Sequence, residues 1–143
     1  MLNELIFFEA RIFRMFCEKL QVSPVDANKL FEKYGIWKYI EDTYECAVND
    51  IWEILKVKSI KLEGEFYNKP ETVNDKITEQ KRFCADLILT DAIMDMAEED
   101  GITWQEARSK IINSNAYTAL YDLETGLWGN GPDYFRDFYK KTA

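Results

Sequence analysis

Five carboxylates gather in one short stretch of the sequence, and their spacing suggests binding chemistry. Asp91, Asp95 and Glu99 recur every four positions, which places them on one face of a helix. Glu98 and Asp100 follow at the end of the same stretch. Negative charge at a helix C-terminus opposes the helix dipole, so this arrangement costs stability unless solvent or a basic partner offsets it. We expect either a solvated helix face or an acidic docking surface for a basic protein.

Trp128 stands in a glycine-rich stretch from Gly126 to Gly131. The stretch lacks the Gly-Lys-Ser/Thr ending of a P-loop and the preceding strand of a dinucleotide-binding fingerprint. We expect a turn that folds Trp128 back onto the core. The alternative is that Trp128 is exposed as an anchor for a partner, because tryptophan is favoured at binding hot spots.

Residues for nucleophilic or metal chemistry are sparse. The chain has no histidine, which removes the commonest metal ligand and the commonest general base near neutral pH. Cys17, Cys46 and Cys84 lie far apart with no Cys-x-x-Cys motif, so we expect reduced, buried thiols. Paired carboxylates remain open, since acidic pairs need not be adjacent in sequence. We predict no catalytic, cofactor-binding or metal-ligating residues and therefore no enzyme.

Glu9 is the one charged residue inside an apolar stripe at the start of the chain. Taking 100° per residue, Ile12, Phe13 and Phe16 share one face of a helix over residues 2–20, whereas Arg14 lies off that face. A carboxylate among apolar residues is costly unless it is paired. We expect Glu9 either to reach the rim or to meet an Arg or Lys, with a functional buried acid as the alternative.

The apolar periodicity predicts an all-α, mostly helical protein. Caps and glycines set the helix boundaries, such as Ser23 and Pro24 at one start, Gly35 and Gly101 at two ends, and the Thr103 to Glu106 capping box. Trp37 and Ile40 should pack inward. The predicted helices cover residues 2–20, 23–33, 36–44, 46–56, 75–99, 103–113, 117–122 and 132–141, with a short extended or β segment near 57–67.

The second part of the chain echoes the first at an offset of eighty positions. Val22, Ser23 and Asp26 are matched by Ile102, Thr103 and Glu106, and the series continues without a gap through Trp37/Tyr117 and Ile40/Leu120. The matched positions are caps, turns and core residues, so they specify a scaffold. We predict two pseudo-repeated helical halves packed as one unit, with a first repeat at 1–60, a linker at 61–74 and a second repeat at 75–143.

Composition narrows the class of partner. The chain has 143 residues, 47% of them apolar, and a net charge of −8 from 18 basic and 26 acidic residues. Nucleic-acid phosphate is bound chiefly by clustered Lys and Arg, so direct nucleic-acid binding is not expected. Charged residues interrupt the apolar N-terminus and no apolar run approaches the length of a bilayer. We expect a cytoplasmic protein with no membrane association.

Two stretches resemble known families. Lys29 to Ile40, with Tyr44-Glu45 after it, resembles a family of short uncharacterised bacterial proteins about one repeat long, and Tyr117 to Trp128 resembles another such small family. In the first family a Leu-His pair often follows the second tyrosine; here Ala47-Val48 stands instead. Such families tend to be encoded beside toxins that look like ADP-ribosyltransferases. The resemblance therefore implies an antitoxin or immunity-like protein that occludes a toxin-like enzyme.

Three functional hypotheses follow. The first is a protein-interaction module that neutralises a toxin-like enzyme through Asp91, Asp95, Glu98, Glu99, Asp100 and Trp128. The second is a helix-turn-helix-like regulatory module, for which the basic candidates in the second half are Arg108, Lys110, Lys140 and Lys141. The third is a small-molecule binder or enzyme with a cleft between the halves. Homo-oligomerisation stays open.

Overall fold

The computed structural model of the chain describes residues 2–43 and 73–142. Within these two ranges the backbone forms helices and no strand, so the all-α prediction is confirmed. The expected helix at 46–56, the extended segment near 57–67 and nearly all of the linker at 61–74 lie outside the described residues. The described elements are α1 (Leu2–Leu20), α2 (Pro24–Lys33), α3 (Ile36–Thr43), α5 (Val73–Asp100), α6 (Trp104–Ile112), α7 (Asn115–Tyr121), η2 (Leu123–Thr125), η3 (Leu127–Gly129) and α8 (Gly131–Thr142).

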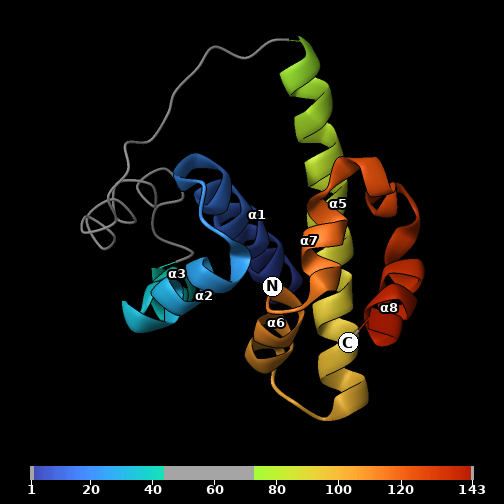
Figure 1. The fold of residues 1–143 in the computed structure, drawn as a ribbon. Coiled ribbons are helices and arrows are strands. Elements are labelled where there is room, and N and C mark those ends of the chain that lie inside the picture. The colour runs from blue at the N-terminus through green and yellow to red at the C-terminus, as the bar shows by residue number, and fades with distance from the viewer. Residues whose placement is uncertain (1, 44–72, 143) are drawn as a thin grey trace.

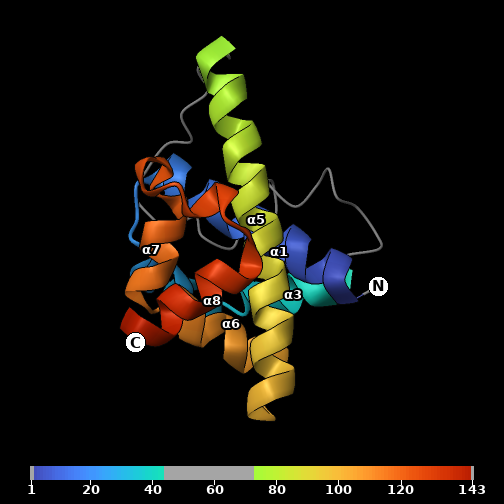
Figure 2. The ribbon, with the colours of Figure 1, turned by 90° about the vertical axis from the view of Figure 1, so that its right-hand side faces the viewer.

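The 28-residue helix α5 is the axis of the molecule. It contacts α1, α6, α7 and α8 as well as the two short 3-10 helices, and its first turns extend beyond the other described helices (Figures 1 and 2). Helices α2 and α3 lie on the far side of α1 from α8 (Figure 1). A helix with neighbours on several sides needs apolar residues around much of its circumference.

Local signals set the helix boundaries. The Ser23 hydroxyl accepts a hydrogen bond from the Asp26 amide at 3.2 Å, and the Thr103 hydroxyl accepts one from the Glu106 amide at 3.1 Å. Helices α1 and α5 both end on a residue with a left-handed backbone, Gln21 (φ 52°) and Gly101 (φ 64°). These features repeat at the offset of eighty, although the duplication and its domain boundaries stay predictions.

The core is aromatic and draws on helices from both ends of the chain. The Phe13 ring lies 5.2 Å from Trp37, 5.1 Å from Phe31 and 5.9 Å from Tyr117, measured between ring centroids. Stacked and edge-to-face aromatic pairs at these distances stabilise beyond the area they bury. Trp37 and Ile40 are buried as predicted. One continuous core therefore joins α1, α2 and α3 to α7.

A buried arginine ties α1 to α5. The Nε and Nη2 atoms of Arg14 donate to the Asp86 carboxylate at 2.9 to 3.1 Å, and Nη1 and Nη2 donate to Glu79 at 2.8 to 3.1 Å. Tyr121 of α7 donates its hydroxyl to Asp86 at 2.6 Å. Arg14 is 2% exposed and Asp86 is fully buried. The prediction that Arg14 lies away from the packed face was wrong, because Asp86, 72 residues later, supplies its countercharge.

Removing one partner of this cluster should be far more costly than removing both. We expect Arg14→Met to lower the free energy of unfolding by about 3–5 kcal/mol, because it leaves the Asp86 carboxylate buried without a countercharge. Arg14→Met with Asp86→Leu should recover most of that loss. Urea unfolding gives the free energy of unfolding of both variants.

Arg82→Met is the matched control, since the Arg82 side chain pairs with Glu18 at the surface. It should cost at most about 1 kcal/mol. An Arg14→Met variant as stable as Arg82→Met would contradict the importance of the cluster.

Candidate functional site

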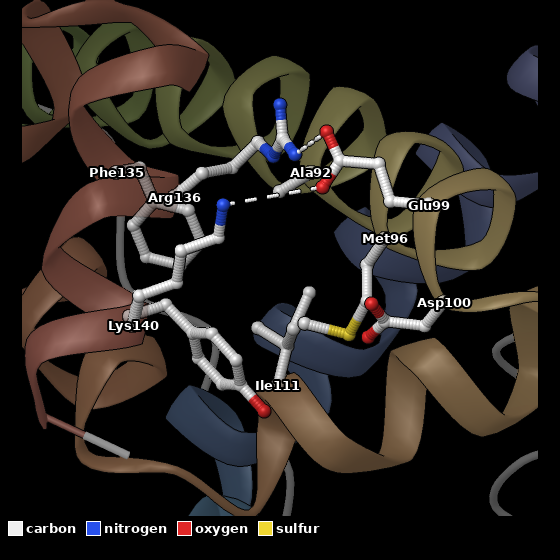
Figure 3. Close-up of a pocket in the computed structure, with 9 residues that line it drawn as sticks. Ala92, Met96, Glu99, Asp100, Ile111, Phe135, Arg136 and Lys140 are labelled. Carbon is white, nitrogen blue, oxygen red and sulfur yellow. Dashed lines mark ion pairs between the residues drawn. The ribbon is translucent and has the colours of Figure 1, made fainter.

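Helix α8 lies against the acidic end of α5 and neutralises part of it. Arg136 pairs with Glu99 (Figure 3). Its Nη1 also lies 3.6 Å from Asp95 Oδ2. Lys140 Nζ lies 4.0 Å from Glu99 Oε2. These pairs hold the pKa of Glu99 below its ordinary value, with the Arg136 hydrogen bond as the first cause. Two of the five carboxylates singled out from the sequence thus have partners within the molecule.

The other three carboxylates are turned to solvent. Asp91, Glu98 and Asp100 are exposed and form no ion pair with any cation in the described part of the chain. Partial burial and the neighbouring Asp95 raise the pKa of Asp91. A nearby cation stabilises the ionised form of a carboxylate whose pKa is raised by like charge. The acidic end of α5 therefore retains unpaired negative charge beside the α8 ion pairs.

A cavity opens among α5, α6 and α8 at this acidic end. Its volume is about 180 Å³, and Ala92, Met96, Ile111, Phe135 and Tyr139 provide its apolar walls. Glu99, Arg136 and Lys140 stand along one side of the cavity and Asp100 along another (Figure 3). Asp100 also contributes, after burial, to raising the pKa of the Tyr139 hydroxyl. The site combines an apolar hollow with a charged rim.

Trp128 takes a structural position away from the carboxylates. Its indole N–H donates to the Leu123 carbonyl at 2.9 Å, its half-buried ring packs against the core, and the Lys81 ammonium lies 5.2 Å from the ring centroid. Lys81 precedes Asp91 on α5 by roughly 15 Å of helix. The glycine-rich turn folds Trp128 inward, with Gly126 at φ 73° and Gly131 at φ 84°. Trp128 is therefore not brought together with the acidic residues.

Glu9 is fully buried and meets an arginine, which was one of the two expected environments for it. Arg108 Nη1 donates to Glu9 Oε1 at 2.8 Å and lies 3.7 Å from Glu41 Oε2. The Arg108 guanidinium stacks on the Trp37 ring at 3.8 Å, with Trp104 at 5.3 Å. Burial raises the pKa of Glu9 to about 8 against the opposing attraction of Arg108. Glu9 Oε2 and Arg108 Nε make no hydrogen bond within the described structure.

The thiols and acids offer little for metal or nucleophilic chemistry. Cys17 is half-buried, and burial raises its thiol pKa to about 12, which keeps it protonated. Cys84 is exposed, so the expectation of a buried thiol was wrong there: it lies on the outer face of α5 beside the exposed Phe83 and Leu87. Cys46 lies outside the described residues. No group of three or more potential metal ligands occurs within residues 2–43 and 73–142.

The basic residues considered for a nucleic-acid surface do not form one group. Arg108 is buried against Glu9, and Lys140 faces Glu99. Lys110 and Lys141 are exposed on α6 and α8. Arg108 is thus unavailable to a surface patch that would contact phosphates.

Comparisons with protein-family models, with curated proteins and with solved structures find no match. Among the described helices, none combines the length and the apolar character that crossing a bilayer requires. The functional argument therefore starts from the geometry of the site.

Sequence reasoning found the acids of this site and missed its basic and apolar parts. Arg136 and Lys140 stand four positions apart, which matches the four-residue spacing of Asp95 and Glu99. That complementary spacing was a usable signal for antiparallel or crossed packing of α8 on α5. The buried position of Phe135 follows only from the three-dimensional contact.

Glu9 should make stability depend on pH. Its pKa is about 8 in the folded protein and 4.5 as the ordinary value, so the folded state binds the extra proton between these values. The stabilisation is fully present below pH 4.5 and is lost as the pH rises through 8, at no more than about 1.4 kcal/mol per pH unit. Glu9→Gln should reduce the decline of unfolding free energy between pH 5 and 8.

The matched control is Glu124→Gln, which changes an exposed carboxylate of η2. It should keep the wild-type pH dependence in urea unfolding. Parallel curves for the wild type and Glu9→Gln would show that Glu9 does not retain its proton in the folded state.

Proposed function

We propose that this protein is a protein-interaction module that binds a basic partner at the acidic end of α5. The observation that carries the proposal is the apolar cavity among α5, α6 and α8, which the unpaired Asp100 lines. The exposed Asp91 and Glu98 lie on the same helix. Interfaces draw much of their binding energy from a few anchors that fill a central hollow, surrounded by polar residues that exclude water. One apolar side chain of the partner enters the cavity, and basic groups around it meet Asp91, Glu98 and Asp100.

Charge complementarity supports a basic rather than a neutral or acidic partner. The chain carries a net charge of −8. Arg136 and Lys140 of α8 already lie against Asp95 and Glu99, whereas Asp91, Glu98 and Asp100 have no ion pair among the described residues. Such a surface attracts a positively charged protein at long range and raises the association rate at low salt.

Within this class, we propose a neutralising role against a toxin-like enzyme. The resemblance of Lys29–Ile40 and Tyr117–Trp128 to families encoded beside such toxins suggests the partner, and the acidic face suits occlusion of a basic, nucleotide-binding cleft. The protein acts by covering that cleft and requires no chemistry of its own.

Co-expression with the product of the adjacent gene tests the role. We expect a complex that co-elutes on gel filtration and growth that recovers when both proteins are produced. Neither a complex nor recovery of growth would contradict the neutralising role. A complex without recovery would leave interaction in place and remove neutralisation.

Charge substitution tests the surface. We expect Asp91→Asn, Glu98→Gln and Asp100→Asn together to lower the association rate about tenfold at low salt and to flatten its salt dependence. The three residues pair with no described cation, so folding should be unaffected. Surface plasmon resonance against the co-expressed partner measures the rate.

The control is a triple variant with the same change in net charge at exposed carboxylates of other elements: Asp26→Asn, Asp42→Asn and Glu124→Gln. It should change the association rate much less. Equal effects of the two triple variants would show that overall charge, and not the end of α5, governs association.

A further inference from the structure

A second cavity lies between α1 and α7, on residues that the α5–α8 cavity does not share. Its volume is about 280 Å³, near the lower end for small-molecule pockets. Helices from before and after the undescribed stretch both line it. The lining residues are Arg14, Cys17, Glu18, Pro24, Tyr117, Thr118, Tyr121 and Asp122.

The body of this cleft is apolar and aromatic. The Tyr117 and Tyr121 rings lie 4.8 Å apart between centroids at an angle of 42°. Pro24 and the Cys17 side chain complete the apolar walls. Because burial keeps the Cys17 thiol protonated, it acts here as an apolar wall and not as a nucleophile or a metal ligand. These surfaces suit a hydrocarbon or aromatic body of a few atoms.

Arg14 cannot offer the cleft a free positive charge. Each of its three nitrogen atoms already donates to Asp86 or Glu79, and Nη1 lies 3.9 Å from Glu18. The Tyr121 hydroxyl donates a hydrogen bond to the same Asp86 carboxylate. An anionic ligand would therefore have to break a buried ion pair to reach the guanidinium.

The rim of the cleft is negative. The Glu18 side chain is 38% exposed; it pairs with Arg82 and lies 3.9 Å from Arg14 Nη1. Asp122 is exposed, and one of its carboxylate oxygens accepts from the Glu124 amide at 3.2 Å. Two carboxylates, Glu18 and Asp122, thus line the cleft, and the guanidinium group of Arg14, the cation of its lining, is already held by Asp86 and Glu79. The excess charge at the opening favours a cation.

We propose that this cleft binds a small organic amine, with its apolar body against Tyr117, Tyr121 and Pro24 and its ammonium group at Asp122 and Glu18. The Thr118 hydroxyl at the rim supplies a further acceptor. The site is separate from the protein-docking surface, and neither proposal depends on the other.

The probe is 2-phenylethylamine, compared with the uncharged 2-phenylethanol and the anionic 3-phenylpropionate. Amide chemical shifts in ¹⁵N-labelled protein report binding, residue by residue, at concentrations up to about 10 mM. We expect saturable shifts at Thr118 and Asp122 with the amine, weaker shifts with the alcohol and none with the acid. No saturable shift with the amine, or equal binding of amine and alcohol, would overturn the proposal.

Asp122→Asn removes the rim charge while its amide oxygen can still cap η2. We expect about three- to fivefold weaker binding of the amine. Asp133→Asn, at an exposed residue on α8 with the same charge change, should leave the affinity unchanged. Thr118→Phe should fill the opening and abolish binding while melting as the wild type does. Equal effects of the two Asp variants, or amine binding unaffected by Thr118→Phe, would place the amine elsewhere.

A lysine-containing peptide distinguishes the source of the ammonium group. The free amine should shift Thr118 and Asp122 without competition from the peptide. A peptide that displaces the amine at lower concentration would overturn the assignment to a small molecule and make the cleft a contact for a protein side chain.

Discussion

Two buried guanidinium groups hold the parts of this molecule in register. Arg14, from the first stretch of helices, pairs with Glu79 and Asp86 of α5, whereas Arg108 of α6 donates to Glu9 of α1 and is approached by Glu41 of α3. Each arginine therefore crosses to acids on the opposite side of the undescribed stretch. A buried charge without its partner is strongly unfavourable, so sliding α1 along α5 or away from α6 would uncover at least one such charge. The aromatic core supplies attraction, and these pairs select one arrangement.

The sequence predicted what local chemistry controls. Ser23 and Thr103 are caps because their hydroxyls reach an amide three residues on, and Gly35 and Gly101 end helices because glycine adopts positive φ without strain. The pairing of Arg14 was missed because its partners lie on another helix. Periodicity along α1 alone places Arg14 off the apolar face, and only the approach of α5 makes that position interior. For Glu9 the need for a cation was visible, but its identity, 99 residues away, was not.

In the candidate site, too, local features could be predicted from the sequence and contacts between helices could not. The acids at the end of α5 can be recognised in the sequence because they lie on consecutive turns of one helix. The cavity beside them exists only where α5, α6 and α8 meet. Trp128 was proposed as an anchor on residue type, but its N–H and ring are satisfied within its own turn and against α5. Residue type sets what a side chain can do; the packing of α8 decides which side chains remain available.

The echo at offset eighty gains physical content from two matched positions. Asn28 and Arg108 are equivalent in the echo, both are buried, and both face Trp37: Asn28 Oδ1 accepts from the indole N–H at 2.9 Å, and the Arg108 guanidinium stacks on the ring. One tryptophan thus joins a neutral amide from α2 and a cation from α6. The cation donates to Glu9 and approaches Glu41, whereas the amide needs no countercharge. The same asymmetry appears outside, where α5 ends in carboxylates and α1 ends in Glu18, Lys19 and Leu20. At the surface, α8 pairs with Asp95 and Glu99 and leaves Asp91, Glu98 and Asp100 without an ion pair among the described residues.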